Sequence, residues 1–320
     1  MSSPSRRGSR PAAIGGRRDQ LATGNPGRAS YDAGRAEQAG RDTEATTPRL
    51  HLLASGDVLP HRSVQERAKG YGARSGHRFD FRPMFAAIRP LVSAADLAVC
   101  HLETPLSPSG RRLSGYPRFN APSQLAAAIH SAGYDACSVA SNHAMDQGAQ
   151  GVAGTLAVLD RAGLRHAGTA RRPREARPRI LTVRHVRVAV LSYTYGLNGF
   201  RLPHGRPWLV NLLSPGRILA DARAARRAGS QFTVVFLHWG QEYRSTPTPT
   251  QRTRGQGACQ GLGQPGNTGP APPLPAAHHH RHRAHSALGS PAMTPCVKAA
   301  RSLPTPTAPT RLWSATIRAR

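Results

Sequence analysis

Four short apolar segments of this sequence each end in residues that can bind a metal ion or transfer a proton. Asp57 follows the first segment, Glu103 the second, the pair Asn142 and His143 the third, and His238 ends the fourth. A single Asp or Glu behind a strand is usually a turn or helix-capping residue, so one such position would carry no conclusion. Recurrence at four segment ends instead indicates one shared site.

The residue types in this set predict hydrolytic chemistry. Carboxylates, imidazoles and an amide oxygen form a mixed nitrogen and oxygen ligand set, which suits Mn²⁺, Zn²⁺ or Fe. The set contains no thiolate, so it does not describe a structural zinc site. Two divalent ions about 3.5–4 Å apart can hold a phosphoryl oxygen and lower the pKa of a bridging water so that it attacks in line.

The elements that must position these residues alternate between strand-like and helix-like patterns. Apolar runs predict strands at Leu50–Ser55, Leu97–Leu102, Ala136–Ala140 and Phe232–Leu237, and a hairpin over Ile180–Tyr193 broken near His185. Helical periodicity predicts helices at Pro83–Ala94, Ser123–Ala132, Gln147–Ala162 and Pro215–Ala228. Such near-continuous apolar strands are typical of a sheet buried by helices, so the fold class is α/β. Ligands collect beyond the carboxyl ends of strands in such sheets, which is where the four segment ends are expected to meet.

Composition divides the chain into three zones. Residues 1–47 are rich in Arg, Gly, Ser and Ala without apolar periodicity, which predicts a disordered arm because little surface can be buried. Residues 48–250 carry the strand and helix patterns and form the predicted domain. Residues 251–320 are crowded with Pro, Thr, Ala, Gly, His and Arg, and we expect a low-complexity tail that is disordered or out of frame.

The tail is set apart by its lack of acidic residues. No Asp or Glu follows Glu242, although acids cap helices, pair with Arg and keep a folded surface soluble. A natural low-complexity tail and a reading-frame slip both explain this composition. The abrupt change near residue 250 and the lack of any repeat favour the slip, so the domain is predicted to be truncated within its sheet.

The net charge of +28 does not by itself predict a nucleic-acid partner. Clustered cations would suggest one, because they release counterions when they meet phosphates. Of the 44 basic residues, however, only Lys69 and Lys298 are lysines. With abundant Ala, Gly and Pro, this bias indicates coding composition rather than a selected surface, and we predict no nucleic-acid partner.

The start of the chain bears on localisation. Its opening segment, MSSPSRRGSRPAAIGGRRDQ, is basic but lacks the apolar stretch of about 7–15 residues that a secretory signal needs. No later run of the sequence is long enough to span a membrane. The sequence therefore predicts a cytoplasmic protein, with membrane association left open, and it leaves the oligomeric state undetermined.

Four motifs occur in a fixed order along the predicted domain. They are Gly56-Asp57, Asp96-Leu97 leading into Leu102-Glu103-Thr104-Pro105-Leu106, Ser141-Asn142-His143-Ala144 with Asp146 and Gly148, and His238-Trp239-Gly240 with Glu242-Tyr243. In this order they resemble the successive motifs of the CapA capsule-synthesis (poly-γ-glutamate biosynthesis) proteins, and the resemblance extends over residues 48–250. It implies a calcineurin-like metallophosphoesterase fold, a four-layer α-β-β-α sandwich with a two-metal centre.

The resemblance also implies a role for each matching residue. Asp57 corresponds to the metal ligand of the first motif, and Glu103 to a carboxylate that coordinates or bridges metal ions. Asn142 corresponds to an amide ligand, and His143 to the residue that stabilises a transferring phosphate or protonates a leaving group. His238 corresponds to a later metal-binding histidine.

This chain departs from the family pattern at three places. The histidine expected two residues after the first Asp is absent, and the nearest, His61, is an alternative metal ligand. His101 stands where many relatives have Asn, which adds a ligand or changes only its surroundings. The last family motif, a Gly-x-His-Pro-His-like stretch, does not occur in the tail. A centre that lacks those imidazoles binds metal more weakly, so we expect impaired activity in this chain.

These observations predict a CapA-like capsule-synthesis protein with a metal-dependent phosphoesterase-type site. The expected cofactors are divalent Mn, Zn or Fe ions, two in an intact homologue. The expected partners are a phosphoester substrate or an anionic polymer, together with capsule-assembly membrane proteins. Two alternatives stay open, a non-catalytic accessory or scaffold protein of poly-γ-glutamate assembly and a non-functional frameshifted remnant.

Overall fold

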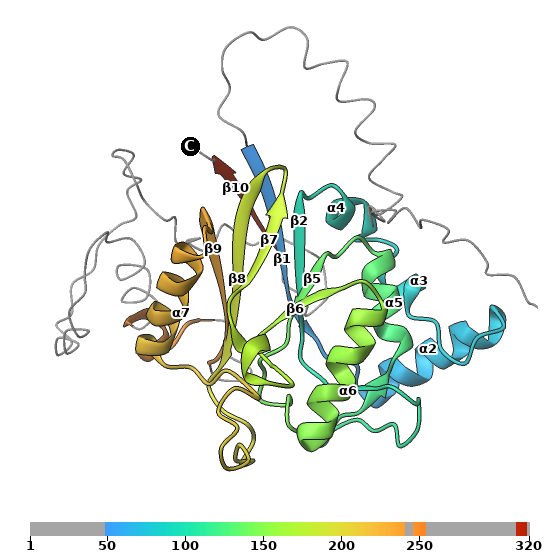
Figure 1. Cartoon of the computed structure of the whole chain (residues 1–320). Helices are drawn as coiled ribbons and strands as arrows, with labels where there is room; N and C mark the ends of the chain where they lie inside the picture. The colour runs from blue at the N-terminus through green and yellow to red at the C-terminus, as the bar shows by residue number, and fades with distance from the viewer. Residues whose placement is uncertain (1–48, 241–245, 254–311, 319–320) are drawn as a thin grey trace, which may run out of the picture.

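The computed structural model describes residues 49–240, 246–253 and 312–318 (Figure 1). The predicted arm, residues 1–47, lies outside the described residues, as does most of the predicted tail. Within that tail, residues 249–253 form a helical turn and residues 312–318 form a strand, neither of which the sequence analysis predicts.

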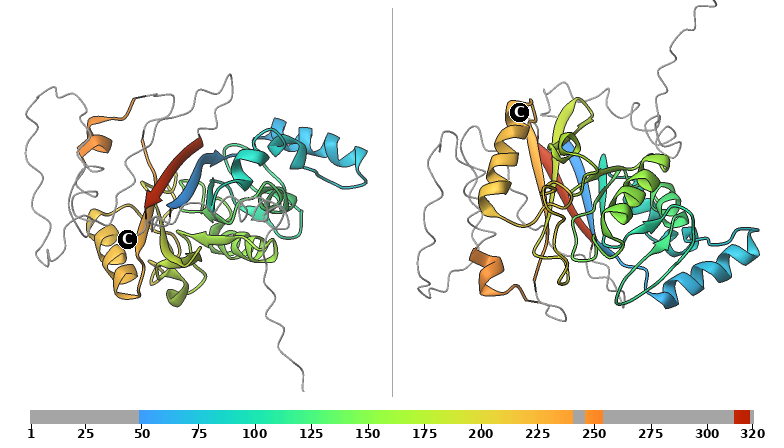
Figure 2. Two further views of the ribbon diagram at one scale, coloured as in Figure 1. Left: turned by 90° about the horizontal axis from the view of Figure 1, so that it is seen from above. Right: turned by 60° about the horizontal axis from the view of Figure 1, so that its bottom comes forward.

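The larger of two main sheets, called the large sheet, is mostly parallel. Its strand order is β10-β1-β2-β5-β6, formed by β10 (Leu312–Arg318), β1 (Arg49–Val58), β2 (Leu97–Leu102), β5 (Ala136–Ser138) and β6 (Arg165–Ala167). Only β10 runs antiparallel, alongside β1. Its outer side carries helices α2 (Arg62–Arg74), α3 (Arg82–Phe85), α4 (Arg89–Ser93), α5 (Gln124–Ser131) and α6 (Gly148–Arg161) (Figures 1 and 2). Strands β3 (Leu106–Ser107) and β4 (Ala121–Pro122) pair with each other near α6.

The second sheet, called the small sheet, has the order β7-β8-β9. Strands β7 (Arg179–Val183) and β8 (Val186–Thr194) form the predicted antiparallel hairpin, and β9 (Phe232–His238) lies parallel to β8. The hairpin turns at Arg184 and His185, whose φ angles of 46° and 69° lie in the left-handed region. A 3-10 helix, η1 (Pro173–Ala176), precedes β7, and α7 (Pro215–Arg227) covers the outer face of the small sheet.

Alternating side chains of the strands bury three apolar layers, which makes the molecule a four-layer α-β-β-α sandwich (Figure 1). In β1, Leu50 and Leu52 pack between the two sheets while Leu53 packs toward the helices of the large sheet. In β8, Val188 packs between the sheets and Leu191 packs toward α7. This alternation follows from the period of two along a strand. The predicted α/β class and its four layers are confirmed.

Most predicted elements agree with the structure to within a few residues, and one does not. The helix predicted over Pro83–Ala94 is two short helices, α3 and α4. Pro90 lies in the first turn of α4 and has no N–H to continue a helix from α3, and a proline also clashes with the carbonyl four residues earlier. The sequence analysis did not predict α2, which buries only Gln65, Ala68 and Gly72 and therefore shows a weak apolar stripe.

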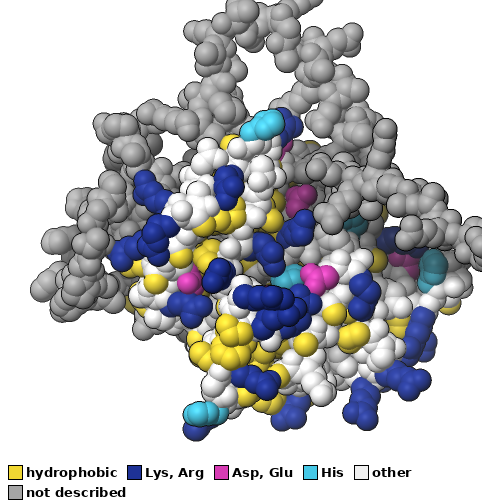
Figure 3. Space-filling view, in the orientation of Figure 1, with side chains coloured by type: hydrophobic (Ala, Val, Ile, Leu, Met, Phe, Trp, Pro, Cys, Tyr) yellow, Lys and Arg dark blue, Asp and Glu magenta, His cyan; other side chains and the backbone are white. Residues whose placement is uncertain are grey.

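Charge is spread widely over the molecule. Figure 3 shows Lys and Arg side chains over most of the visible face and few acidic ones among them. In the part of the chain that the structure describes, no helix combines the length and the apolar character needed to cross a membrane.

Candidate metal centre

Asp57, His101 and His238 converge where the two sheets meet. One ligand atom from each lies within 4.8 Å of the others. The Oδ1 atom of Asp57 lies 3.6 Å from His238 Nδ1 and 3.9 Å from His101 Nε2. The two imidazole rings stack with centroids 4.8 Å apart and planes inclined by 16°. The geometry thus brings one carboxylate and two imidazoles together at one point.

Strand register explains why these three residues meet. Asp57, near the end of β1, is the register partner of His101 on β2, and His101 is the partner of Ser138 on β5. His238 is the last residue of β9. It lies an even number of positions from Val234, so its side chain is on the same face of the strand as Val234, between the sheets. The carboxyl ends of strands from both sheets therefore supply the group, as the sequence analysis predicted for the edge of a parallel sheet.

His101 has the properties of a neutral metal ligand. Burial, and to a lesser extent the neighbouring His238 imidazole, lowers the pKa of His101 to about 3, so its ring is neutral near neutral pH. The Nδ1 atom lies 2.6 Å from the Ser138 hydroxyl, which fixes the ring orientation. Its Nε2 atom is buried and, among the residues that the structure describes, has no hydrogen-bond partner. A buried ring nitrogen left without a partner beside a carboxylate fits a divalent cation.

The exposure and charge of Asp57 support the same assignment. Burial would raise the pKa of Asp57, but the approach of the His238 and His101 imidazoles outweighs burial and lowers the pKa below the usual value. The carboxylate is therefore ionised at neutral pH. Its side chain is 51% exposed, whereas those of His101 and His238 are 7% and 14% exposed. The group is thus open to solvent on the Asp57 side, as a catalytic rather than a structural site requires.

Glu103 and Asn142 border this group. His238 Nε2 lies 2.9 Å from Asn142 Oδ1 and 3.7 Å from Glu103 Oε1. Both residues are buried, and each follows a strand of the large sheet. The Ser141 hydroxyl donates a hydrogen bond of 2.5 Å to the backbone carbonyl of Glu103, which ties the two loops together. Four of the predicted residues, Asp57, Glu103, Asn142 and His238, therefore lie in one contiguous cluster.

His143 lies beside this cluster in a fixed orientation. Its Nδ1 atom is 2.8 Å from Asp146 Oδ2, and that oxygen also accepts a 2.7 Å hydrogen bond from the Phe119 backbone N–H. The Phe119 ring packs edge-on against the imidazole, with centroids 4.7 Å apart. Asp146, which the sequence analysis quoted only as part of a motif, thus orients the imidazole.

Asn198 is a site residue that the sequence analysis missed. Its Oδ1 atom accepts a 3.1 Å hydrogen bond from Asn142 Nδ2, and its own Nδ2 lies 3.4 Å from both ring nitrogens of His143. Asn198 follows β8 in the small sheet and has a φ of 48°, a conformation that Asn adopts more readily than most residues. The Asn198-Gly199 pair is a turn signal in the sequence, but it does not indicate a site residue.

Two other residues lie apart from the group of Asp57, His101 and His238. His61 precedes α2 and packs edge-on against Phe119, with ring centroids 5.2 Å apart. The structure does not bring His61 into the three-residue group, and its role as a ligand stays a prediction. Asp96, at the start of β2, accepts a 2.7 Å hydrogen bond from the His51 backbone N–H and pairs with Arg184 at 2.6 Å. Asp96 therefore joins the two sheets at the end away from the site.

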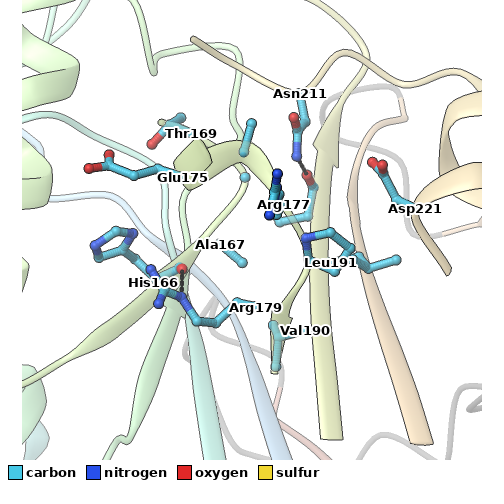
Figure 4. A pocket seen from close by; sticks show the side chains of 14 residues that line it. His166, Ala167, Thr169, Glu175, Arg177, Arg179, Val190, Leu191, Asn211 and Asp221 are labelled. Carbon is cyan, nitrogen blue, oxygen red and sulfur yellow. Dashed lines mark hydrogen bonds between the residues drawn. The ribbon is translucent and has the colours of Figure 1, made fainter. Parts of the chain in front are cut away.

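A further cavity lies between β6 and the β7–β8 hairpin (Figure 4). Asn211 donates a 3.3 Å hydrogen bond to the Ser192 carbonyl there, and Arg179 donates one to the His166 carbonyl. The enclosed space is about 10 Å³, which is close to the lower limit for one water molecule. This cavity is too small to bind a substrate.

Solved structures with a related arrangement include two nucleotidases. The chain is similar to a 5'-nucleotidase precursor from Thermus thermophilus, with a TM-score of 0.37 and 15% identity over 60% of this chain and 38% of that one. It is also similar to the NAD nucleotidase (NadN) of Haemophilus influenzae, with a TM-score of 0.38 and 14% identity over 61% and 39% of the two chains. Likeness at this level carries no conclusion about activity.

Curated proteins with similar sequences come from two bacilli. The chain is 24% identical over 225 residues to the capsule biosynthesis protein CapA of Bacillus anthracis, covering 65% of this chain and 53% of that protein. It is 24% identical over 207 residues to the PGA biosynthesis protein CapA of Bacillus subtilis (strain 168), covering 62% and 50%. The chain spans about half the length of these relatives.

The family comparison covers the site described above. Residues 51–260 match the family described as bacterial capsule synthesis protein PGA_cap. The matched range includes Asp57, His101, Asn142 and His238 and both sheets apart from β10. It therefore covers well over half of the 320 residues, and the chain belongs to the bacterial capsule synthesis protein PGA_cap family.

Proposed function

We propose that this chain is a metal-dependent phosphoester hydrolase of capsule biosynthesis. The observation that carries the proposal is the convergence of Asp57, His101 and His238 at the carboxyl ends of strands from both sheets. Their ligand atoms lie within 4.8 Å of one another. Three protein ligands and an open side leave room for a water molecule and a substrate oxygen.

Asp57, His101 and His238 would hold the ion, with Glu103 and Asn142 next to it on the His238 side. The bound cation would lower the pKa of a water molecule and polarise a phosphoryl oxygen. Ser138 keeps the Nε2 atom of His101 turned toward the ion by holding Nδ1. The mixed carboxylate and imidazole set suits Mn²⁺, Zn²⁺ or Fe.

His143 is the proposed proton donor to the leaving oxygen. The Asp146 carboxylate accepts a hydrogen bond from Nδ1–H and would stabilise the imidazolium form, in which Nε2 also carries a proton and would give it to the leaving oxygen. The packing of Phe119 against the ring excludes water from one side and limits its rotation. Asn198 holds both the Asn142 amide and the His143 ring, so the two residues keep a fixed mutual position.

The family match supports a substrate of capsule formation, and the residues of the site support a phosphoester as its chemical class. We propose a phosphoester that belongs to, or is attached to, an anionic capsule polymer. Activity is expected to be low in this chain, because the three residues that converge suffice for one ion and the last family motif is absent from the sequence. A second ion would depend on Glu103 and Asn142, which border the three-residue group.

Metal content and turnover test this proposal together. The purified full chain should contain about one equivalent of Mn²⁺, Zn²⁺ or Fe by elemental analysis and should hydrolyse p-nitrophenyl phosphate. Asp57→Asn and His238→Ala should lose both the metal and the turnover, whereas His143→Ala should lose turnover and keep the metal. His204→Ala removes an exposed imidazole that lies outside the group of Asp57, His101 and His238, so it serves as the matched control.

The accessory-protein alternative predicts a different pattern. A scaffold protein would bind an anionic polymer without metal, would keep that binding in His143→Ala, and would show no turnover in any variant. This pattern would overturn the hydrolase proposal. A chain that binds neither metal nor polymer would support the frameshifted remnant.

A further inference from the structure

An open groove of about 590 Å³ is lined in part by His61, whose ring packs against Phe119 next to His143. It is formed by the start of α2 and by residues 112–118 of the loop between β3 and β4. This groove is far larger than the cavity of Figure 4, at about 10 Å³. It has room for several non-hydrogen atoms of a ligand.

The lining of the groove is basic. Its lining includes His61, Arg62, Arg112 and Arg118. None of the described residues that line the groove is acidic. Glu66, which is the one acidic residue of α2, is not part of the lining. The first turn of α2 has no acidic residue and no side-chain cap, so its N–H groups add a partial positive charge.

The loop that carries two of these arginines is held in place. The Asn120 side chain donates a 2.9 Å hydrogen bond to the Arg112 carbonyl, and the Ser114 hydroxyl donates one to the Arg118 carbonyl. Gln65 of α2 donates a 2.9 Å hydrogen bond to the Ser114 carbonyl. These contacts fix the backbone at both arginines, and the Arg118 guanidinium lies over the Phe200 ring, 5.0 Å from its centroid. A loop backbone held in this way loses less entropy when it binds a ligand.

The groove adjoins the proposed catalytic histidine through one aromatic ring. Phe119 packs edge-on against His143, with ring centroids 4.7 Å apart, and against His61 of the groove, with ring centroids 5.2 Å apart. Gln147 lines the groove and donates a 3.0 Å hydrogen bond to the Phe119 carbonyl. Phe119 is fully buried and lies between His143 and His61, so a ligand that occupied both places would have to cross over this ring.

We propose that this groove is a subsite for an oligoanion, a ligand with two or more phosphate or carboxylate groups. Arg112 and Arg118 would pair with these groups through charge-assisted hydrogen bonds. The subsite rests on the proposed function in one respect, that the anionic groups belong to the substrate whose phosphoester lies at His143. The groove would then select substrates that carry negative charge beyond the scissile bond.

Calorimetric titration of the full chain tests the subsite. The protein is freed of metal ions so that the probes cannot bind them, and is titrated with tripolyphosphate and, in a second arm, with tricarballylate. The double variant Arg112→Gln/Arg118→Gln should bind the tighter probe about tenfold or more weakly. The matched control Arg226→Gln/Arg227→Gln removes the same charge from exposed positions at the end of α7 and should change the affinity less than about twofold.

The outcomes separate the subsite from general charge. Equal losses in both double variants, or no loss in either, would overturn the proposal, because binding would then reflect only the net positive charge. Arg112→Lys/Arg118→Lys should recover part of the affinity, and a thermal melt checks that each variant is folded. If tripolyphosphate binds more tightly, phosphate is the recognised group, and if tricarballylate binds more tightly, carboxylate is.

The same experiment distinguishes this inference from the hydrolase proposal. His238→Ala should lose turnover of p-nitrophenyl phosphate and keep oligoanion binding. Turnover without a groove-dependent affinity would overturn the subsite alone. Groove-dependent affinity without turnover in the unmodified chain would overturn the hydrolase proposal and leave the anion site standing.

Discussion

His101 and His238 stack face to face, with ring centroids 4.8 Å apart and planes inclined by 16°, although they come from different sheets. His101 belongs to β2 of the large sheet and His238 ends β9 of the small sheet. Their contact requires both sheets to be packed correctly, because neither strand pairs with the other. The proposed metal centre therefore depends on the sheet-to-sheet layer of the sandwich.

The ligand role of His101 predicts a loss of metal affinity on substitution. His101→Ala removes one of three converging ligands, so its affinity for Zn²⁺ or Mn²⁺ should fall by about 10–100-fold or more. His61→Ala should change the affinity by less than about twofold, because the His61 ring packs against Phe119 and lies outside the three-residue group. Competition with a chromogenic chelator measures both values. A larger effect at His61 than at His101 would reverse the assignment.

Asn198 should act as a positioning residue. Asn198→Gly keeps the backbone conformation at φ 48° but removes the amide that contacts Asn142 and His143. We expect kcat for p-nitrophenyl phosphate to fall about tenfold with KM and metal content little changed. Asn198→Ala should show the same kinetic loss and a lower melting temperature, because alanine is strained at positive φ.

If kcat and metal content fell together in Asn198→Gly, the residue would support the metal cluster as a whole and would not position His143.

Glu175 should stabilise the fold in a pH-dependent manner. Burial would raise the pKa of Glu175, but hydrogen bonds from Arg171 and Arg172 outweigh it and lower the pKa from 4.5 to about 2. A depressed carboxyl pKa adds stability above the unfolded value that is lost as the pH falls toward the folded value. Glu175→Gln should therefore lower the free energy of unfolding at about pH 7 by roughly 0.5–1 kcal/mol, the range for a partly exposed pair.

Urea unfolding at a series of pH values measures this difference. It should shrink as the pH falls from about 4.5 toward about 2, and Glu66→Gln on the exposed side of α2 is the control. A difference that stays constant over this window would mean that the ion pairs do not contribute.

The helix layer should depend on Leu156 of α6. This side chain is fully buried in the layer between α6 and the large sheet. Leu156→Ala should lower the free energy of unfolding by about 2–5 kcal/mol, because it removes apolar contacts and leaves a cavity. Leu91, which is 42% exposed, provides the matched control, and Leu91→Ala should cost less than about 1 kcal/mol. Similar losses at the two positions would contradict the described packing.

Strand β10 should contribute to stability through its backbone. Residues 312–318 pair with β1 over seven positions, with Ser314 opposite Leu53 and Ala315 opposite Leu52. Successive N–H groups of a strand point in opposite directions, so either Ser314→Pro or Ala315→Pro removes a hydrogen bond to β1. One of the two should lower the free energy of unfolding by more than about 1 kcal/mol and increase aggregation through the uncovered edge.

Ala315→Val suits a strand and should leave both properties unchanged. If both proline variants were as stable as the unmodified chain, the pairing of β10 with β1 would not contribute to the free energy of unfolding. Light scattering during thermal unfolding reports the aggregation.

Local patterns were enough to predict most of the elements. The run Leu97–Leu102 agrees with β2 at both ends, and the break near His185 agrees with the turn between β7 and β8. The pattern failed for α2, whose helix buries few residues, for the proline-interrupted segment that forms α3 and α4, and for the short strands β3, β4 and β6. Where periodicity is weak or broken, sequence reasoning has little to detect.

The sequence by itself determined which residue types stand at the strand ends. Asp57, Glu103, Asn142 and His238 each follow or end an apolar run, and their chemistry predicts a divalent cation. These inferences required only the identities of residues adjacent in the sequence, because strand alternation and strand ends are local properties.

Only the tertiary structure decided which of these residues meet, and with which others. His101 joins Asp57 because β1 and β2 are in register, and it meets His238 because the two sheets pack face to face. Asn198 reaches Asn142 and His143 across a separation of more than 50 residues. Contacts of this kind depend on register and on the packing of whole layers, which no short stretch of sequence encodes.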